Sequence, residues 1–502
     1  LGAAEDKDAV NLLVSAATKD ADSRVRISSI RALAGIRDTK AAEPLLARSQ
    51  LLFASYKNAR KPDFIPYAQN EFIEIATALG RLMTNTRDER AVDLFRQFGK
   101  LDRGLSPEVY IARLRISPGR GDDGKPEMTN WRQYSTVAQV IGEFATLEPT
   151  NDEGKRMKTE APDILRPLAK AYAEADPVKD ADTIKAGPDV LRAYAAFKPA
   201  DLSELLRDAL KNKDLFIRAT AAELLAEQPS SEQNLAALNL ELDYAFRNDD
   251  QFNDAVLATL DALFKLDKQK SLSAIALAVA SRDHLVRRRA MNMLRDDAFK
   301  NVATLPPALR YAAQKDLEVV RPYSGAGMKL GQILNTEADY RRALSRKNGS
   351  VRAVLTTQKG AFTIDFLPED APLTVDNFIK LARANYFNGL EVHRVVPNFV
   401  MQDGDPRGDG NGGPGWSIRC EINMVPYDRG AVGMALSGKD TGGSQWFVTH
   451  SAQPHLDGGY TVFGRVNETG MKVVDNIVRG DKIVRVKIVE VVSTQRWQRK
   501  KS

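Results

Sequence analysis

Three short runs near the end of the chain place polar side chains among apolar and aromatic ones. They are Val-His-Arg-Val-Val-Pro-Asn-Phe-Val-Met-Gln-Asp-Gly-Asp at 392–405, Gly-Gly-Ser-Gln-Trp-Phe at 442–447 and Leu-Asp-Gly-Gly-Tyr-Thr-Val-Phe-Gly at 456–464. Arg394 stands out among these residues because a guanidinium stays charged and presents several N–H donors in a fixed fork. Such a donor beside an apolar pocket suits hydrogen bonding to a carbonyl oxygen.

The residues needed for several other reaction chemistries are missing. The run 442–447 fails the nucleophile-elbow pattern, because Trp446 stands where glycine is required. The glycine-rich loops lack the Gly-Lys-Ser/Thr ending of a phosphate loop. The aspartates that begin at Asp403 fail as a calcium loop, because Pro414 takes the twelfth position, and the four histidines do not pair at metal-ligand spacing. We therefore expect no metal and no cofactor.

The three runs resemble, in their order and spacing, the signature motifs of the cyclophilins. They correspond to F-H-R-[IV]-[IV]-x-x-F-[MV]-x-Q-x-G-D, to G-S-Q-F-F and to L-D-G-x-[HY]-x-V-F-G. The resemblance covers roughly residues 349–492, and the glycine-rich run 407–415 looks most like that of bacterial members. It implies a peptidyl-prolyl cis–trans isomerase and a closed antiparallel eight-stranded β-barrel capped by two helices.

The resemblance also implies a role for individual residues. Arg394 would donate to the prolyl carbonyl and favour a pyramidal nitrogen in the twisted amide, whose rotation meets a barrier of ~18–20 kcal/mol. The implied catalytic residues are Arg394, Phe399 and Gln402. The implied substrate-binding residues are Val400, Ala435, Leu436, Gln445, Phe447, His455, Leu456 and Tyr460.

Three of these positions depart from the commonest cyclophilin pattern. Val400 replaces a frequent methionine, which changes the pocket volume modestly. Leu436 replaces an asparagine whose backbone binds substrate, and a backbone contact survives such a change. His455 stands where many eukaryotic members have a tryptophan linked to tight cyclosporin binding. Isomerase activity is therefore implied, whereas tight cyclosporin binding is not.

The first 320 residues predict helices almost throughout, because apolar residues recur at helical spacing and glycine and proline lie between the segments. An Asp-x-x-[Val/Ile]-Arg pattern opens three of them, at 22–26, 214–218 and 283–287, with the aspartate placed as a helix N-cap. The pattern resembles HEAT repeats, stacked helical hairpins that form a curved solenoid and bind protein on the concave face. An irregular all-helical domain is the alternative.

From Val351 onward, the spacing of apolar residues changes from helical to alternating. We expect a short helix over 337–345, a β-hairpin over 351–367, helices over 372–384 and 470–478, and a last strand over 484–492. The predicted domains are a HEAT-like solenoid over 1–322, a linker with a short helix over 323–345, a cyclophilin-like domain over 346–495 and a basic tail over 496–502.

Charge and composition limit the partners. Residues 346–502 carry 21 Lys+Arg and 16 Asp+Glu, a net +5, so that the whole-chain charge of +6 leaves only +1 for residues 1–345. A nearly neutral helical region disfavours nucleic-acid binding, which needs clustered positive charge. No apolar run is long enough to span a membrane. The chain begins at Leu1 rather than Met. A removed signal peptide therefore stays open, and both a bacterial cytoplasm and a periplasm fit.

Two functions are compatible with these patterns. The first is a bacterial isomerase and foldase in which the solenoid holds a protein client and the cyclophilin-like domain isomerises its X–Pro bonds. The second is an interaction scaffold whose cyclophilin-like domain binds proline-containing peptides with little catalytic role. Proline-containing proteins or peptides are the expected substrates in both cases, and a further protein partner is expected on the solenoid.

Overall fold

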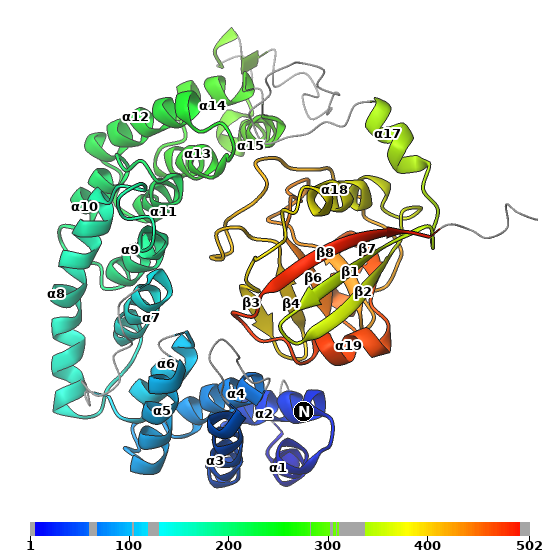
Figure 1. Ribbon diagram of the computed structural model, residues 1–502. Coiled ribbons are helices and arrows are strands. Elements are labelled where there is room, and N and C mark those ends of the chain that lie inside the picture. Colours follow the sequence, from blue (N-terminus) through cyan, green and yellow to red (C-terminus); the bar gives the residue numbers. More distant parts are fainter. Residues whose placement is uncertain are drawn as a thin grey trace, which may run out of the picture.

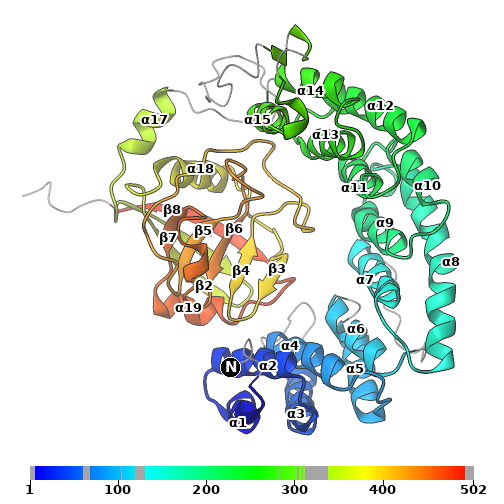
Figure 2. The same cartoon turned by 180° about the vertical axis from the view of Figure 1, so that it is seen from behind.

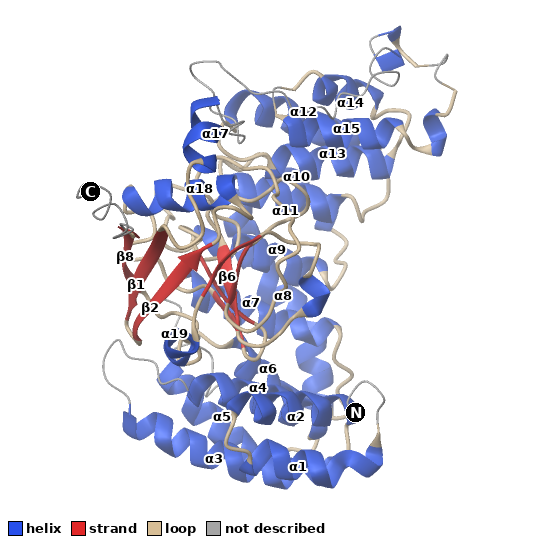
Figure 3. Cartoon of the chain, turned by 90° about the vertical axis from the view of Figure 1, so that its right-hand side faces the viewer, coloured by secondary structure: helices blue, strands red, loops and turns tan. Residues whose placement is uncertain are grey.

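The structure is a computed structural model that describes residues 6–59, 68–102, 105–118, 130–281, 283–301, 305–307, 309–310 and 337–491. Residues 323–336 of the predicted linker region (323–345) and the basic tail lie outside the described residues. Helices fill the N-terminal part and strands the C-terminal part (Figure 3). No helix in the described ranges is both long and apolar enough to cross a membrane.

The N-terminal helices form two layers. The inner-layer helices pack one against the next along the chain, and the outer-layer helices cover them. The inner helices are α2 (Ser23–Ile36), α4 (Ala68–Leu82), α6 (Pro107–Ile116), α7 (Trp131–Gly142), α9 (Gly187–Ala195), α11 (Leu215–Leu225), α13 (Asp254–Leu266) and α15 (His284–Leu294). The outer helices are α1 (Val10–Lys19), α3 (Ala42–Ala59), α5 (Glu89–Asp102), α8 (Asp152–Glu174), α10 (Leu202–Ala209), α12 (Glu232–Asn248) and α14 (Leu272–Val279). Together the layers curve into an arc (Figures 1 and 2).

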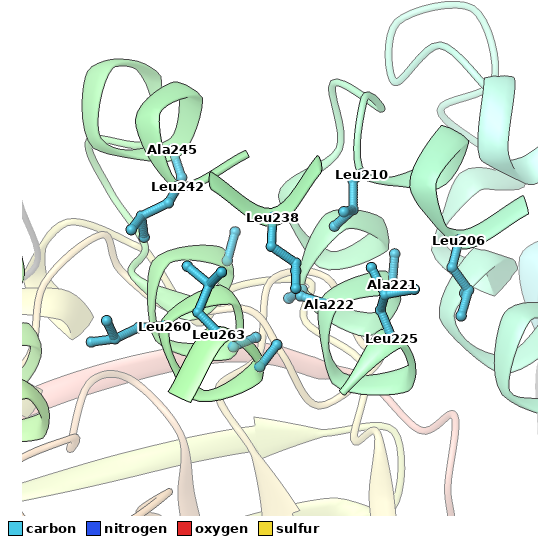
Figure 4. Packing of buried hydrophobic residues seen from close by; sticks show 14 of the residues in the cluster. Leu206, Leu210, Ala221, Ala222, Leu225, Leu238, Leu242, Ala245, Leu260 and Leu263 are labelled. Atoms are coloured by element: carbon cyan, nitrogen blue, oxygen red, sulfur yellow. The ribbon is translucent and has the colours of Figure 1, made fainter. Parts of the chain in front are cut away.

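Apolar side chains fill the space between the two layers. Leu206 from α10, Leu225 from α11, Leu238 from α12 and Leu263 from α13 are buried in one continuous core (Figure 4). Each buried leucine contributes roughly 1.5–3 kcal/mol relative to an exposed one. The stacking of hairpins therefore stabilises an array in which each helix pair contacts mainly its neighbours.

The repeated Asp-x-x-[Val/Ile]-Arg pattern has the structural role that the sequence predicts for its aspartate. The side chains of Asp22, Asp214 and Asp283 each accept a hydrogen bond from a backbone N–H in the first turn of α2, α11 and α15. The arginine of the pattern braces the preceding turn, as Arg218 does by donating to the carbonyls of Asn212 and Lys213 at 2.9 Å. The same local solution thus recurs along the arc.

An eight-stranded antiparallel sheet forms the C-terminal domain, in the order β3-β4-β6-β5-β7-β2-β1-β8. Its strands are β1 (Val351–Thr357), β2 (Gly360–Phe366), β3 (Arg394–Val396), β4 (Val400–Asp403), β5 (Ala431–Met434), β6 (Trp446–Thr449), β7 (Val462–Arg465) and β8 (Ile483–Glu490). Helix α17 (Glu337–Leu344) precedes the sheet, and α18 (Pro372–Arg383) and α19 (Glu468–Val474) pack against it at opposite ends (Figure 1).

The sheet curls into a half-barrel rather than the fully closed barrel that the resemblance implies. Its edge strands β3 and β8 do not pair as strands in the described residues. Their ends meet only at a bridge between Glu391 and Lys482 and at neighbouring hydrogen bonds, such as that from Val392 N to Asp481 O at 2.8 Å. The contact with the β8 side is made at Glu391 and Val392, before β3 begins at Arg394, whereas the three residues of β3 pair with β4.

The concave face of the arc contacts the sheet domain along its length. Five of these contacts come from inner-layer helices. The pairs are Ser28 with Asn398, Asn70 with the carbonyl of Ile477, Glu108 with Arg479, Arg132 with Glu391 and Arg288 with Asp440. The helical arc therefore surrounds one side of the sheet domain, and any cleft there has walls from both parts of the chain.

Candidate active site

A cavity of 220 Å³ lies on the sheet domain where β3, β4 and β6 are neighbours. Its lining residues are Arg394, Phe399, Val400, Gln402, Ala435, Leu436, Phe447, Leu456 and Tyr460. These are nine of the eleven residues that the sequence assigns to catalysis or substrate binding. The structure thus brings together side chains that are up to 66 positions apart in the chain.

Strand register places the central side chains on one face of the sheet. Arg394 of β3 is paired with Gln402 of β4, and Gln402 is paired with Phe447 of β6. Directly opposed residues in an antiparallel pair point to the same face. Val400 joins them, because it is two residues from Gln402 on β4. A turn at Asn398, with φ of 56°, reverses the chain between β3 and β4 and leaves Phe399 at the edge of the cavity.

The deep end of the cavity is apolar. Val400, Phe447 and Leu456 are at most 8% exposed. The Phe447 ring stacks on Tyr427 with centroids 5.5 Å apart and meets the edge of Tyr460 at 6.1 Å. Such packing holds the aromatic walls in fixed positions, and the cavity suits a small apolar ring.

A chain of hydrogen bonds orients the guanidinium of Arg394. Its Nη1 donates to Gln402 Oε1 at 3.0 Å, and Gln402 Nε2 donates to Gln445 Oε1 at 2.9 Å. Gln445 Nε2 in turn donates to the carbonyls of Gly410 and Gly412 at 2.8 and 2.9 Å. Each amide is held at both of its ends, so that the orientation of Arg394 depends on the glycine-rich loop.

The remaining donors of Arg394 are available to a ligand. No carboxylate in the described parts of the chain pairs with this guanidinium, whose Cζ lies 5.8 Å from the centre of the Phe399 ring. Desolvation by the surrounding walls lowers the pKa of Arg394 from its usual value, but a guanidinium stays protonated at neutral pH. The cavity therefore combines an apolar pocket with an oriented cation at its mouth. This arrangement can bind an apolar ring and polarise a carbonyl beside it.

Two predicted substrate-binding residues lie outside the cavity wall. Gln445 lines an adjacent cavity and acts on Arg394 through Gln402. His455 is exposed and stacks on the Phe399 ring, with centroids 5.6 Å apart and planes inclined by 25°. His455 therefore supports a wall residue from outside.

Sequence reasoning missed two sets of residues at the site. The first set is the carbonyls of Gly410 and Gly412, which end the hydrogen-bond chain from Arg394. The glycine-rich run predicted a loop, but nothing in the sequence indicated that its carbonyls accept hydrogen bonds from Gln445. The second set comes from the helical arc, because two cavities that share Gln402 with the first are lined partly by α7 and α13. No local pattern in those helices signals this proximity.

Asp403, the neighbour of Gln402 on β4, is expected to make stability depend on pH. Its side chain is fully buried and its carboxylate oxygens have no hydrogen-bond partner among the described residues. Burial raises the pKa of Asp403 from 3.8 to about 7. The native state therefore keeps a proton that the unfolded chain loses. Stability falls as pH rises through this window, by up to about 4 kcal/mol.

We expect Asp403→Asn to remove most of this dependence and to raise the urea midpoint of the full chain at pH 8 more than at pH 4. Asp365→Asn is the matched control, because Asp365 is exposed on β2 and its replacement should change neither midpoint appreciably. A lower midpoint for Asp403→Asn than for the wild type at pH 8 would show that the charged carboxylate is stabilising.

Comparisons with known proteins agree with this geometry. Residues 352–495 match the family described as cyclophilin type peptidyl-prolyl cis-trans isomerase/CLD. A peptidyl-prolyl cis-trans isomerase of Synechococcus elongatus is 48% identical over 139 residues, which are 28% of this chain and 96% of the relative. Peptidyl-prolyl cis-trans isomerase B of Bacillus subtilis is 48% identical over 126 residues, which are 25% of this chain and 87% of the relative.

A solved structure is also similar. A cyclophilin type peptidyl-prolyl cis-trans isomerase of Cryptosporidium parvum is 27% identical, with a TM-score of 0.27, and the match covers 28% of this chain and 98% of that chain. The same protein is known in the presence of the dipeptide Ala-Pro.

Proposed function

The chain belongs to the cyclophilin-type peptidyl-prolyl cis–trans isomerase family through residues 352–495, and we propose that this domain isomerises X–Pro bonds in protein clients held by the helical arc. An X–Pro bond prefers trans by only about 0.5–1 kcal/mol, yet its rotation meets a barrier of ~18–20 kcal/mol. The barrier arises from amide resonance. Catalysis therefore requires a group that favours the twisted amide over both planar forms.

Arg394, Gln402 and the apolar walls have distinct parts in this mechanism. The proline ring occupies the pocket formed by Phe399, Val400, Phe447 and Leu456, which holds it while the preceding carbonyl rotates. Arg394 donates to the prolyl carbonyl and favours a pyramidal nitrogen in the twisted state. Gln402 keeps the guanidinium in position. No covalent bond forms or breaks, and no proton is transferred.

The observation that carries this proposal is the guanidinium of Arg394 at the mouth of an apolar cavity, oriented by Gln402 and without a carboxylate partner among the described residues. A protease-coupled assay on an Ala-Pro peptide tests it with the full chain. Acceleration above the uncatalysed rate supports the isomerase. Absence of acceleration by the folded wild-type protein would reject it.

Gln402 is expected to act as a positioning residue for Arg394. Replacing Gln402 with alanine removes one hydrogen bond to a charged group, which is worth roughly 1.5–3 kcal/mol. We expect kcat/KM for the Ala-Pro peptide to fall by at least about tenfold, with most of the loss in kcat because the apolar pocket remains. Gln97→Ala, at an exposed position on α5, is the matched control. A loss confined to KM would assign Gln402 to substrate binding instead.

The proposed role of the helical arc is to hold the client, as a HEAT-like solenoid of bacterial type. The proposal is supported by the two-layer stacking of the helices and by the recurring aspartate caps of α2, α11 and α15. The cavities beside Gln402 also support this role, because helices α7 and α13 of the arc form part of their walls. A client held on this face has an effective concentration near the active site of up to about the mM range.

The alternative is a scaffold whose cyclophilin domain binds proline-containing peptides with little catalysis. It is favoured by the ion pairs Arg132–Glu391 and Arg288–Asp440, which join the helical arc to the sheet domain and suit a fixed binding scaffold. The two functions differ in the consequence of losing Arg394. If the protein is a scaffold, a variant without Arg394 that still binds peptide keeps its function. If it is an isomerase, the same variant loses its function.

A further inference from the structure

Two cavities flank the proposed proline pocket, and both have walls from both parts of the chain. One of 280 Å³ lies between the glycine-rich loop and the start of α13. The other, of 310 Å³, lies between the same loop and helices α7 and α9. Gln402, Gly410 and Asn411 line both, and Gln402 also lines the proline pocket. The three cavities therefore form one cleft that meets at Gln402.

The first flanking cavity, here called the α13 cavity, has one acidic side chain on an otherwise uncharged wall. Asp254, in the first turn of α13, is the one ionisable residue among the described residues that line it. Phe252, Leu257 and Leu285 supply apolar surface from the helical arc. Asp254 is exposed, so that its carboxylate is ionised at pH 8. A long basic side chain fits this wall, because its stem is apolar and its end is cationic.

The second flanking cavity, here called the α7 cavity, is rich in cations. Its described lining contains five cationic side chains and two carboxylates. They are Arg132, Lys185, Arg192, Arg394 and Arg479 against Asp189 and Asp409. Three of the cations are already paired with carboxylates that do not line the cavity, Arg132 with Glu391, Arg192 with Glu223 and Arg479 with Glu108. Lys185 and Arg394 are the two cations of this lining without such a partner among the described residues. Lys185 donates from Nζ to the carbonyl of Arg407 at 2.8 Å, and no carboxylate within the described ranges lies at ion-pair distance from it. An acidic side chain is therefore the complementary ligand for this cavity.

Arg407 joins the walls of the two cavities. Its guanidinium lies over the Phe216 ring at 4.3 Å and pairs with Asp214 at 3.4 Å, both in the helical arc. Phe216 packs in turn against Phe252, with centroids 5.7 Å apart. Phe252 is so close to the glycine-rich loop that a Cβ at Gly413 would lie 3.7 Å from its ring. The walls are therefore held in place before a ligand binds, which lowers the entropy cost of binding.

We propose that the helical arc forms part of the substrate site and selects X–Pro segments with opposite charges on the two sides of the proline. The acidic side chain lies in the α7 cavity and the basic one in the α13 cavity, while the proline occupies the pocket between them. This inference rests on the proposed function for the position of the proline. Gln402 lines all three cavities, so that the charged residues are within a few positions of the proline.

Four fluorescent peptides of equal length test the inference on the full chain at pH 8 and low salt. They carry Glu before and Lys after a central Ala-Pro, the reverse order, Lys on both sides, or neutral residues only. Dissociation constants come from anisotropy and isomerisation rates from NMR exchange. We expect one of the two mixed-charge orders to bind about three- to tenfold more tightly than the neutral peptide. About 1 M salt should remove most of that preference.

Asp254→Asn should remove most of the gain in affinity that the lysine of the peptide provides. It should leave the gain that the glutamate of the peptide provides. The matched control is Glu204→Gln on the outer helix α10, where an exposed carboxylate is neutralised away from the cleft and the affinity ratios should stay as in the wild type. Lys185→Gln should remove the gain due to the glutamate. Equal affinities for the mixed-charge and neutral peptides, or unchanged ratios in Asp254→Asn, would overturn the inference. Failure to accelerate the neutral peptide would reject the proposed isomerase instead, and the affinity ratios would still decide the charge preference.

Discussion

Replacing Arg394 with alanine is expected to lower kcat/KM for an Ala-Pro peptide by about 100- to 1000-fold, the usual cost of removing one donor that stabilises a transition state. The reason is that the cavity offers the carbonyl one oriented cation, held by Gln402 at 3.0 Å. The apolar pocket stays intact, so that peptide affinity should fall much less than the rate. NMR exchange on the full chain measures both quantities.

The control for this variant is Arg352→Ala. Arg352 is exposed on β1 of the same sheet, and its removal changes the net charge equally without touching the cavity. Arg394→Lys adds a second comparison, because an ammonium keeps the charge but loses the fixed fork of donors. Full activity in a correctly folded Arg394→Ala variant would favour the scaffold over the isomerase.

Replacing Arg218 with alanine is expected to lower the stability of the helical arc by about 3–5 kcal/mol, as for the loss of one partner of a buried ion pair. The Arg218 side chain is 1% exposed and pairs with Glu241 at 2.8 Å and with Asp249 at 2.5 Å. Its removal leaves both carboxylates without this cation. The substitution also removes the hydrogen bond from Arg218 to the carbonyl of Asn212. This turn precedes Asp214, which pairs with Arg407 between the helical arc and the sheet domain.

Urea denaturation of the full chain, followed by circular dichroism at a helix-sensitive wavelength, measures this loss. Arg247→Ala on α12 is the matched control, because its ion pair with Asp243 is formed by side chains that are 75% and 52% exposed. Such surface pairs contribute about 0–1 kcal/mol. A similar, small effect of both variants would show that the buried network does not stabilise the arc.

The sequence predicted correctly those features of the fold that depend on residues close together in the chain. Helix capping depends on a few adjacent residues, and the aspartates at Asp22, Asp214 and Asp283 all cap helices as expected. The hairpin of β1 and β2 and the helix α18 follow from periodicity and from Pro372 at a helix start. Boundaries shifted by a few residues, as in α19, which starts at Glu468 rather than Gly470.

The tertiary structure decided how far the sheet closes. The resemblance implied a closed barrel, but β3 (Arg394–Val396) pairs with β4 and not with β8 in the described residues. Its contact with the segment before β8 is limited to the junction of Glu391 with Lys482.

The amino-acid sequence by itself determined the family of the catalytic domain and, through the resemblance of its three motifs to those of the cyclophilins, nine residues of its central cavity. Tertiary structure alone decided what surrounds that cavity. Arg407 is separated from Asp214 by 193 positions, yet the two are 3.4 Å apart. Packing over such separations depends on the curvature of the whole arc. For that reason only the folded chain reveals that Asp254 and Lys185 face the cleft around Arg394.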